Sequence, residues 1–147
     1  MHTLLVVLHV LVVVIVIGPA MLYPFTALKA FEGQKADELS QIGRWTMIFN
    51  GLTLVAALVG VFAALTADTN IFGEVWMIIA STLYVLALIN GIGLLPMIMA
   101  NAAKTLRNGE GQMDADRISQ KKGQIMGFAA ANAVFYILIT VLMTWQP

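Results

Sequence analysis

The chain has 147 residues, of which 60% are hydrophobic and 11% are charged, and its formal net charge is zero. A soluble domain carries about 25% charged residues, so this composition excludes an ordinary water-facing surface and predicts a single-domain membrane protein. The balanced charge excludes a basic stripe for nucleic acid, and the lack of cysteine excludes disulfides and thiolate metal sites.

Four apolar runs without Asp, Glu, Lys or Arg follow one another, each close to the ~20 residues that span a bilayer. We expect membrane-spanning helices over residues 3–23, 45–66, 75–99 and 125–145. A cleaved signal peptide is an alternative for the first run. That run is longer than the roughly 7–15 apolar residues of a signal, and no basic residue precedes it, so we expect a helix that is retained.

The eight basic residues are confined to two of the connections between these runs, residues 24–44 and 101–124. Basic residues accumulate in cytoplasmic loops, and four helices place both of these connections on the same side. The sequence therefore predicts an all-α, up-down-up-down four-helix bundle with both termini outside. The expected location is the bacterial cytoplasmic membrane.

The two basic connections carry helical spacing next to the second and fourth runs. Residues 38–45 and 118–125 repeat with a helical period, and Asp37 and Asp114 are candidate N-caps. Helices 2 and 4 are thus predicted to extend into the cytoplasm, to about 30 residues or ~45 Å each. The preceding helices are predicted to stop at glycines, which are Gly33, Gly109 and Gly111.

The third run contains residues that interrupt a regular helix. Asn90, Gly91, Gly93 and Pro96 lie within seven residues. Because Pro96 removes a backbone donor, we expect a kink near the cytoplasmic edge. Broken helices line substrate sites in transporters, but those proteins have internal repeats and buried charges that this sequence lacks. We therefore do not predict transport or ion conduction.

His9 is the histidine that falls within a predicted span, about 9 Å below the outer edge of the first helix. A neutral imidazole needs hydrogen-bond partners, and Ser81, Thr82 and Thr140 are expected at a similar depth. Three roles stay open: a structural, hydrogen-bonded residue, a haem or metal ligand, and a proton or quinone contact. His2 lies seven residues away, too far along one helix to share a metal ion with His9.

Three asparagines are expected in the inner half of the bilayer, one in each of the later spans: Asn50, Asn90 and Asn132. An amide in lipid needs hydrogen-bond partners. We predict that at least two of these side chains form hydrogen bonds between helices. A substrate-binding role is the alternative.

Small residues spaced four apart allow helix backbones to approach closely. Helix 2 carries Ala56, Gly60 and Ala64, and helix 4 carries Gly127 and Ala131. We predict that the ridge on helix 2 and the β-branched face of helix 1 pack against a partner protein, so that Gly60→Leu weakens partner binding. A ridge inside the bundle would make the same change destabilising.

Two segments resemble helices of small actinobacterial membrane proteins related to the DUF2269 group. They are LHVLVVVIVIGPAMLYP, with His9, Gly18 and Pro19, for the first helix, and FGEVWMIIASTLYVLALINGIGLLP for the third. A histidine followed by a glycine in the first helix is also distantly similar to the HemJ and CopD-type four-helix families. That similarity implies haem binding through His9 and protoporphyrinogen oxidation. This sequence lacks a basic residue in the first span and a second intramembrane histidine.

The sequence has no phosphate loop, nucleophile motif, HExxH or paired intramembrane carboxylates. We therefore predict no catalytic residues, no metal and no cofactor. The leading hypothesis is a non-catalytic accessory subunit that contacts other membrane proteins and lipids. The actinobacterial resemblance implies a respiratory (cytochrome) supercomplex. The alternative is a HemJ-like haem-binding protein or oxidoreductase that uses His9.

Overall fold

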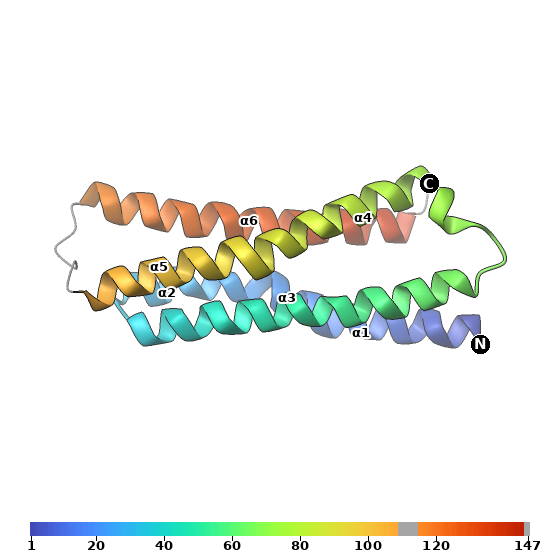
Figure 1. Ribbon diagram of the computed structural model, residues 1–147, viewed down its shortest axis with the longest axis horizontal. Coiled ribbons are helices and arrows are strands. Elements are labelled where there is room, and N and C mark those ends of the chain that lie inside the picture. The colour runs from blue at the N-terminus through green and yellow to red at the C-terminus, as the bar shows by residue number, and fades with distance from the viewer. Residues whose placement is uncertain (109–114, 146–147) are drawn as a thin grey trace.

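A computed structural model describes residues 1–108 and 115–145, and the candidate cap Asp114 and the turn glycines Gly109 and Gly111 lie outside these residues. The described elements are helices, and four helical rods are long and apolar enough to cross a membrane (Figure 1). The predicted all-α fold with four membrane-compatible helices is therefore confirmed. The two chain ends lie at the same end of the molecule (Figure 1). We call this end, with His2 and Trp145, the terminal end, and the end with the turn at residues 33–35 the basic end.

The first rod extends beyond its predicted membrane span of residues 3–23. It comprises α1 (His2–Leu22), the 3₁₀ turn η1 (Tyr23–Phe25) and α2 (Thr26–Glu32). Pro24 lies in the first turn of η1, where its fixed φ fits and its missing N–H is tolerated. The α-helix α1 thus ends next to residue 23, the predicted end of the span, while the rod as a whole continues to the predicted stop at Gly33.

The turn between the first two rods is a Schellman motif. The Lys35 N–H donates to the Ala30 carbonyl (3.0 Å), and the Gln34 N–H donates to the Phe31 carbonyl (3.1 Å). Gln34 adopts the left-handed conformation with φ 55°. Gly33, the predicted turn glycine, is the C-cap of α2 but has an ordinary φ of −77°.

The second rod is α3 (Ala36–Leu65), which is 30 residues long as predicted. Its N-cap is Lys35, without a side-chain capping bond, so the prediction of Asp37 as N-cap is wrong. Asp37 instead lies in the first turn, where the helix dipole favours a negative charge.

A π-helical turn interrupts the third rod. This rod comprises α4 (Val75–Leu88), the π-helix η3 (Ile89–Leu94) and α5 (Leu95–Arg107), and the short 3₁₀ turn η2 (Ile71–Gly73) precedes it. Pro96 is the second residue of α5, and the wider π-helical turn before it accommodates the proline without ending the rod. The Leu95 N–H donates to the Asn90 carbonyl, five residues back.

The fourth rod is α6 (Ala115–Trp145), with 31 residues. The predicted extension of the second and fourth helices beyond their apolar runs is thus confirmed. The third rod also extends beyond its apolar run, which was predicted to end near residue 99, to Arg107.

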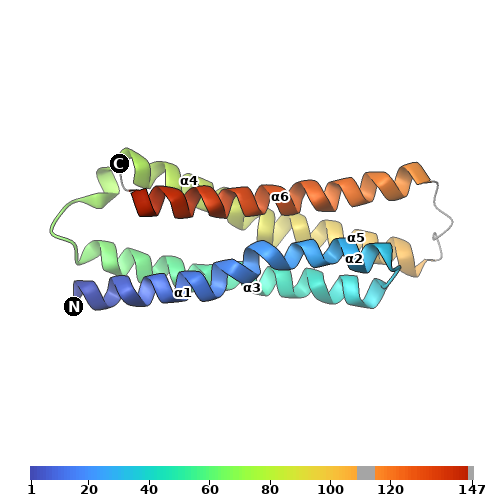
Figure 2. The same cartoon turned by 180° about the vertical axis from the view of Figure 1, so that it is seen from behind.

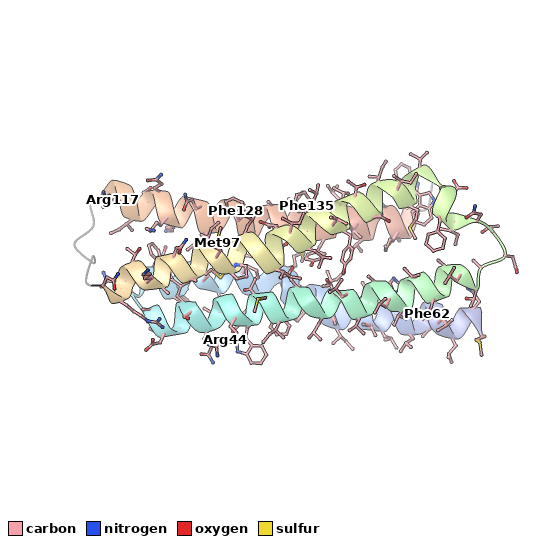
Figure 3. All side chains as sticks on the ribbon, viewed as in Figure 1. Arg44, Phe62, Met97, Arg117, Phe128 and Phe135 are labelled. Carbon is pink, nitrogen blue, oxygen red and sulfur yellow. The ribbon has the colours of Figure 1, made fainter. Side chains whose placement is uncertain are left out.

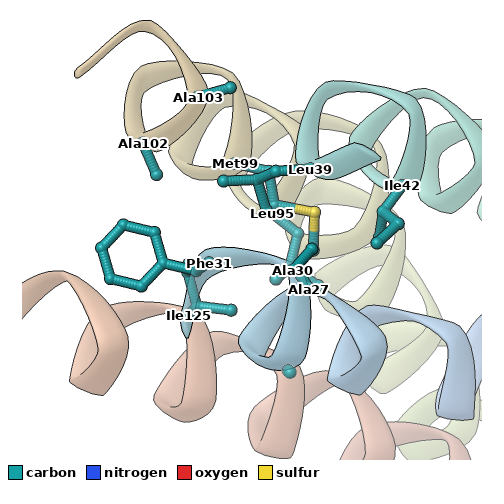
Figure 4. Packing of buried hydrophobic residues seen from close by; sticks show 11 residues of the cluster. Ala27, Ala30, Phe31, Leu39, Ile42, Leu95, Met99, Ala102, Ala103 and Ile125 are labelled. Carbon is teal, nitrogen blue, oxygen red and sulfur yellow. The ribbon is translucent and has the colours of Figure 1, made fainter. Parts of the chain in front are cut away.

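The four rods share their larger apolar core in the basic half. Phe31, Leu39, Leu95, Met99 and Ile125 are buried there together with six smaller or branched residues (Figure 4). A second cluster lies further toward the terminal end, and on the first two rods it stops at Ile17 and Phe49.

Beyond that level α1 lies beside α3, and α4 lies beside α6 (Figures 1 and 2). Of residues 2–22, all described, only Ala20 is buried. Side chains such as Phe62 project outward near the terminal end, whereas Arg44 and Arg117 lie in the basic half (Figure 3).

Candidate functional site

A cluster of neutral polar side chains lies between the four rods. Its centre is Asn50 on α3, which is fully buried. The Oδ1 atom of Asn50 accepts hydrogen bonds from the Tyr136 hydroxyl (2.8 Å) and from Nδ2 of Asn132 (3.4 Å), both on α6. Its own Nδ2 donates to the Thr46 carbonyl (2.8 Å). The amide that the sequence placed in the membrane therefore joins α3 to α6.

Asn132 connects this centre to the first rod. Its Nδ2 also donates to the backbone carbonyl of Ala20 (3.2 Å). In a regular helix that carbonyl would accept from the N–H four residues later, which is Pro24 and has no N–H. Pro24 therefore leaves an acceptor inside the bundle, and the asparagine of α6 uses it. The sequence analysis placed Pro24 at the start of the first basic connection and did not predict this role, although the spacing of four residues indicates it.

Asn90 brings the π-helix into the cluster. Its Nδ2 donates to the Phe128 carbonyl (2.9 Å) and, at 3.5 Å, to Oδ1 of Asn132. Gly91 makes room beside it, because a Cβ at this position would overlap the Asn50 amide. The prediction that at least two of the three asparagines form hydrogen bonds between helices is confirmed.

Thr53 and Tyr84 extend the cluster by one step toward the terminal end. The Thr53 hydroxyl donates to the Asn50 carbonyl (2.6 Å), so the Tyr84 hydroxyl, 3.0 Å away, is the donor to Thr53. Within the described residues, two buried atoms of the cluster have no partner, Oδ1 of Asn90 and Oγ1 of Thr46. All the side chains of the cluster are neutral hydrogen-bonding groups, which suits the joining of helices more than proton transfer.

His9 lies outside this cluster, on the side of α1 that faces α3. Its Nδ1 is 2.9 Å from the Ala56 carbonyl, so the partner is a backbone atom. The expected side-chain partners are not used: Ser81, Thr82 and Thr140 donate to carbonyls of their own helices. The sequence does not indicate this bond. Every helical carbonyl can accept a second hydrogen bond, so no residue type marks the acceptor.

His2 repeats the arrangement one step nearer the chain end. Its Nδ1 is 3.1 Å from the Ala63 carbonyl and 3.1 Å from the Thr66 hydroxyl oxygen. The two histidines are seven residues apart on α1, and Ala56 and Ala63 are seven apart on α3. The two histidines therefore fix one antiparallel register between these helices.

The two predicted small-residue sites, on α3 and on α6, face different surroundings. Gly60 lies against His9, because a Cβ there would be 2.7 Å from Cε1 of the imidazole ring. Ala56 is buried at the same contact. The prediction that the Ala56, Gly60 and Ala64 ridge faces a partner protein is therefore wrong for Gly60, which packs against the protein's own first helix. A Cβ at Gly127, in contrast, would meet no atom within 4 Å among the described residues.

The described residues contain no group of three or more His, Cys, Asp or Glu side chains that could hold a metal ion. For haem, His9 could offer Nε2 as one axial ligand, while His2 lies on the same helix seven residues away. The donor set therefore fits at most a single protein ligand to a haem iron, which is poor support for a resident haem. Comparison with protein-family models, with curated proteins and with solved structures finds no match.

Proposed function

We propose that this protein is a non-catalytic accessory subunit of a larger membrane complex, and that the outward face of α6 receives a helix of a partner subunit. The observation that carries the proposal is a row of small residues on that face. Gly123 and Gly127 are exposed, a Cβ at either would meet nothing within 4 Å among the described residues, and Ala131 follows at the same spacing.

The same face continues as exposed aliphatic surface toward the terminal end. Val134 is 52% exposed, Leu138 44% and Val141 51%. Apolar area alone gains little by leaving lipid tails, so association in a membrane depends on close backbone approach and side-chain packing. A face with glycines at one end and aliphatic side chains at the other provides both.

We further propose that the complex is a respiratory (cytochrome) supercomplex of a bacterial cytoplasmic membrane. This part rests on the resemblance of the first and third helices to actinobacterial membrane proteins. The neutral polar cluster supports a structural role, because its side chains are engaged in joining the rods.

The test is a set of four glycine-to-leucine variants, at positions 123, 127, 51 and 60, purified in mild detergent from the native host. Gly127→Leu should abolish co-purification of the partner subunits while leaving the thermal unfolding of the isolated protein unchanged. Gly51→Leu is the matched control: a Cβ at Gly51 also meets nothing within 4 Å in the described part of the chain, but on α3. It should preserve co-purification.

Gly60→Leu should behave differently from both. Because Gly60 lies under the His9 ring, leucine there should separate α1 from α3 and lower the stability of the isolated protein. Co-purification that survives Gly127→Leu and Gly123→Leu would contradict the proposed face. A purified, partner-free protein that turns over a substrate or shows a stoichiometric Soret band would contradict the accessory role.

A further inference from the structure

His9 presents a hydrogen-bond acceptor that the protein's own packing does not use. Its Nδ1 lies 2.9 Å from the Ala56 carbonyl. A carbonyl oxygen only accepts, so Nδ1 must carry the hydrogen of the ring. In the neutral imidazole the lone pair is then on Nε2.

Nε2 is neither paired nor fully buried within the described residues. It lies 3.3 Å from the point that a Cβ of residue 60 would occupy, so the glycine keeps this edge of the ring uncrowded.

The surroundings of the nitrogen are apolar. His9 lies seven residues from His2, or ~10 Å along the helix from the terminal end. Its neighbours Leu8 and Val10 are 45% and 52% exposed, so they face the hydrocarbon of a bilayer. A group that reaches Nε2 must therefore be soluble in lipid and must bring a hydrogen-bond donor.

The position of His9 favours a small molecule over a partner helix. His9 is on the α3-facing side of α1, whereas Leu4, Leu11 and Ile15 form the outward side and are 71%, 55% and 69% exposed. A helix lying on that outward side would be separated from Nε2 by α1 itself. A metal ion would need further ligands, and the described residues hold no suitable cluster.

We propose that His9 Nε2 binds the hydroxyl group of a lipid-soluble alcohol or phenol of the hydroquinone type, in the leaflet at the terminal end. Nε2 accepts and the hydroxyl donates; no covalent or redox step is involved. The proposal goes beyond the accessory-subunit function and does not depend on it, because the site is complete in the isolated chain.

The test uses the protein in nanodiscs with its histidines labelled with ¹⁵N, and three probes that share one skeleton. These are decylhydroquinone, its dimethyl ether and the corresponding quinone. Only the first can donate a hydrogen bond. It should shift the Nε2 resonance of His9 saturably, whereas the ether and the quinone should bind at least about tenfold more weakly, the factor that a hydrogen bond of ~1.4 kcal/mol provides.

The His2 resonance serves as the internal control and should not respond, because His2 is exposed at the chain end. His9→Phe identifies the resonance by its loss. Equal responses to all three probes, or a ring whose hydrogen resides on Nε2 before any probe is added, would overturn the proposal. So would an Nε2 signal that responds only to exchange of water for D₂O.

Discussion

In the basic half of the bundle all four rods share one core, whereas in the terminal half they associate as two pairs. The basic half buries large side chains such as Phe31, Leu39 and Met99 from different rods. Ion pairs add to it at the surface: Lys122 with Glu32, and Arg107 with Asp37 at 2.8 Å. These pairs are exposed, so they contribute little next to the core.

The terminal half relies on other contacts. Its first helix has no buried residue before Ala20, among residues that are all described, and it is joined to α3 through two histidine-to-carbonyl contacts. Apolar surface that faces lipid does not by itself drive helices together. The basic half and the polar cluster therefore hold the four rods together, while the terminal half leaves helix faces available to lipid or to partners.

The largest expected difference between the two ends is their side of the membrane. The structure places residues 33–35 and 66–74 at opposite ends (Figure 2). In this cysteine-free chain, Thr69→Cys should react with a membrane-impermeant thiol reagent on intact cells, and Gln34→Cys should react only after the cells are opened. Labelling of Gln34→Cys in intact cells would reverse the predicted orientation.

The second test compares two leucines of α3. Leu39 is fully buried in the basic half, and Leu58 is 60% exposed in the terminal half. Leu39→Ala should lower the free energy of unfolding by about 2–5 kcal/mol, because it leaves a cavity among four rods. Leu58→Ala should change it by less than about 0.5 kcal/mol. Thermal unfolding in detergent measures both, and equal losses would remove the distinction between the halves.

The polar cluster lies at the boundary and should give an intermediate effect. Asn50→Leu leaves the Tyr136 hydroxyl and one Asn132 N–H without their acceptor. We expect a loss of about 2–4 kcal/mol, from two desolvated donors and the missing interhelical bonds.

The control for this prediction is a double-mutant cycle. Adding Tyr136→Phe removes one of the orphaned donors, so the double variant should lose less than the sum of the two single losses. Strict additivity would mean that the hydroxyl and the amide do not depend on each other.

The spans could be predicted from the sequence because hydrocarbon excludes charge over a known thickness. The asparagine bonds could be predicted for a related reason, since a buried amide must find a partner. The 3₁₀ turn by which the first rod passes Pro24 could not. A proline disfavours a regular helix locally, but the 3₁₀ turn absorbs it, and tertiary contacts decide whether the chain turns.

The sequence also did not predict which face of each helix points into the bundle. A membrane helix that is apolar on all sides has no amphipathic signal, so the sequence does not reveal that Gly60 faces His9 while Gly127 faces outward. The partner of His9 was missed for another reason. Its acceptor is the backbone carbonyl of Ala56. Because every residue has a backbone carbonyl, the sequence does not indicate which one accepts.

The smallest change in stability is expected in the turn at the basic end. There the left-handed residue is the neighbour of the glycine that the sequence indicated. The sequence suggested Gly33 as the turn residue, but the left-handed conformation belongs to Gln34, with φ 55°. A side chain in that conformation is disfavoured by about 1 kcal/mol relative to glycine. Gln34→Gly should therefore stabilise the protein by about 0.5–1 kcal/mol, with some of the gain offset by the greater freedom of the unfolded chain.

Gly33→Ala is the matched control, one position earlier. Its φ of −77° suits any residue, and the nearest atom to an added Cβ is the Lys29 carbonyl oxygen at 3.4 Å, an ordinary contact. This variant should change stability by less than about 0.5 kcal/mol. Both effects can be read from unfolding midpoints in detergent. A Gln34→Gly variant that is less stable than the parent would show that the glutamine side chain makes a favourable contribution larger than its backbone cost.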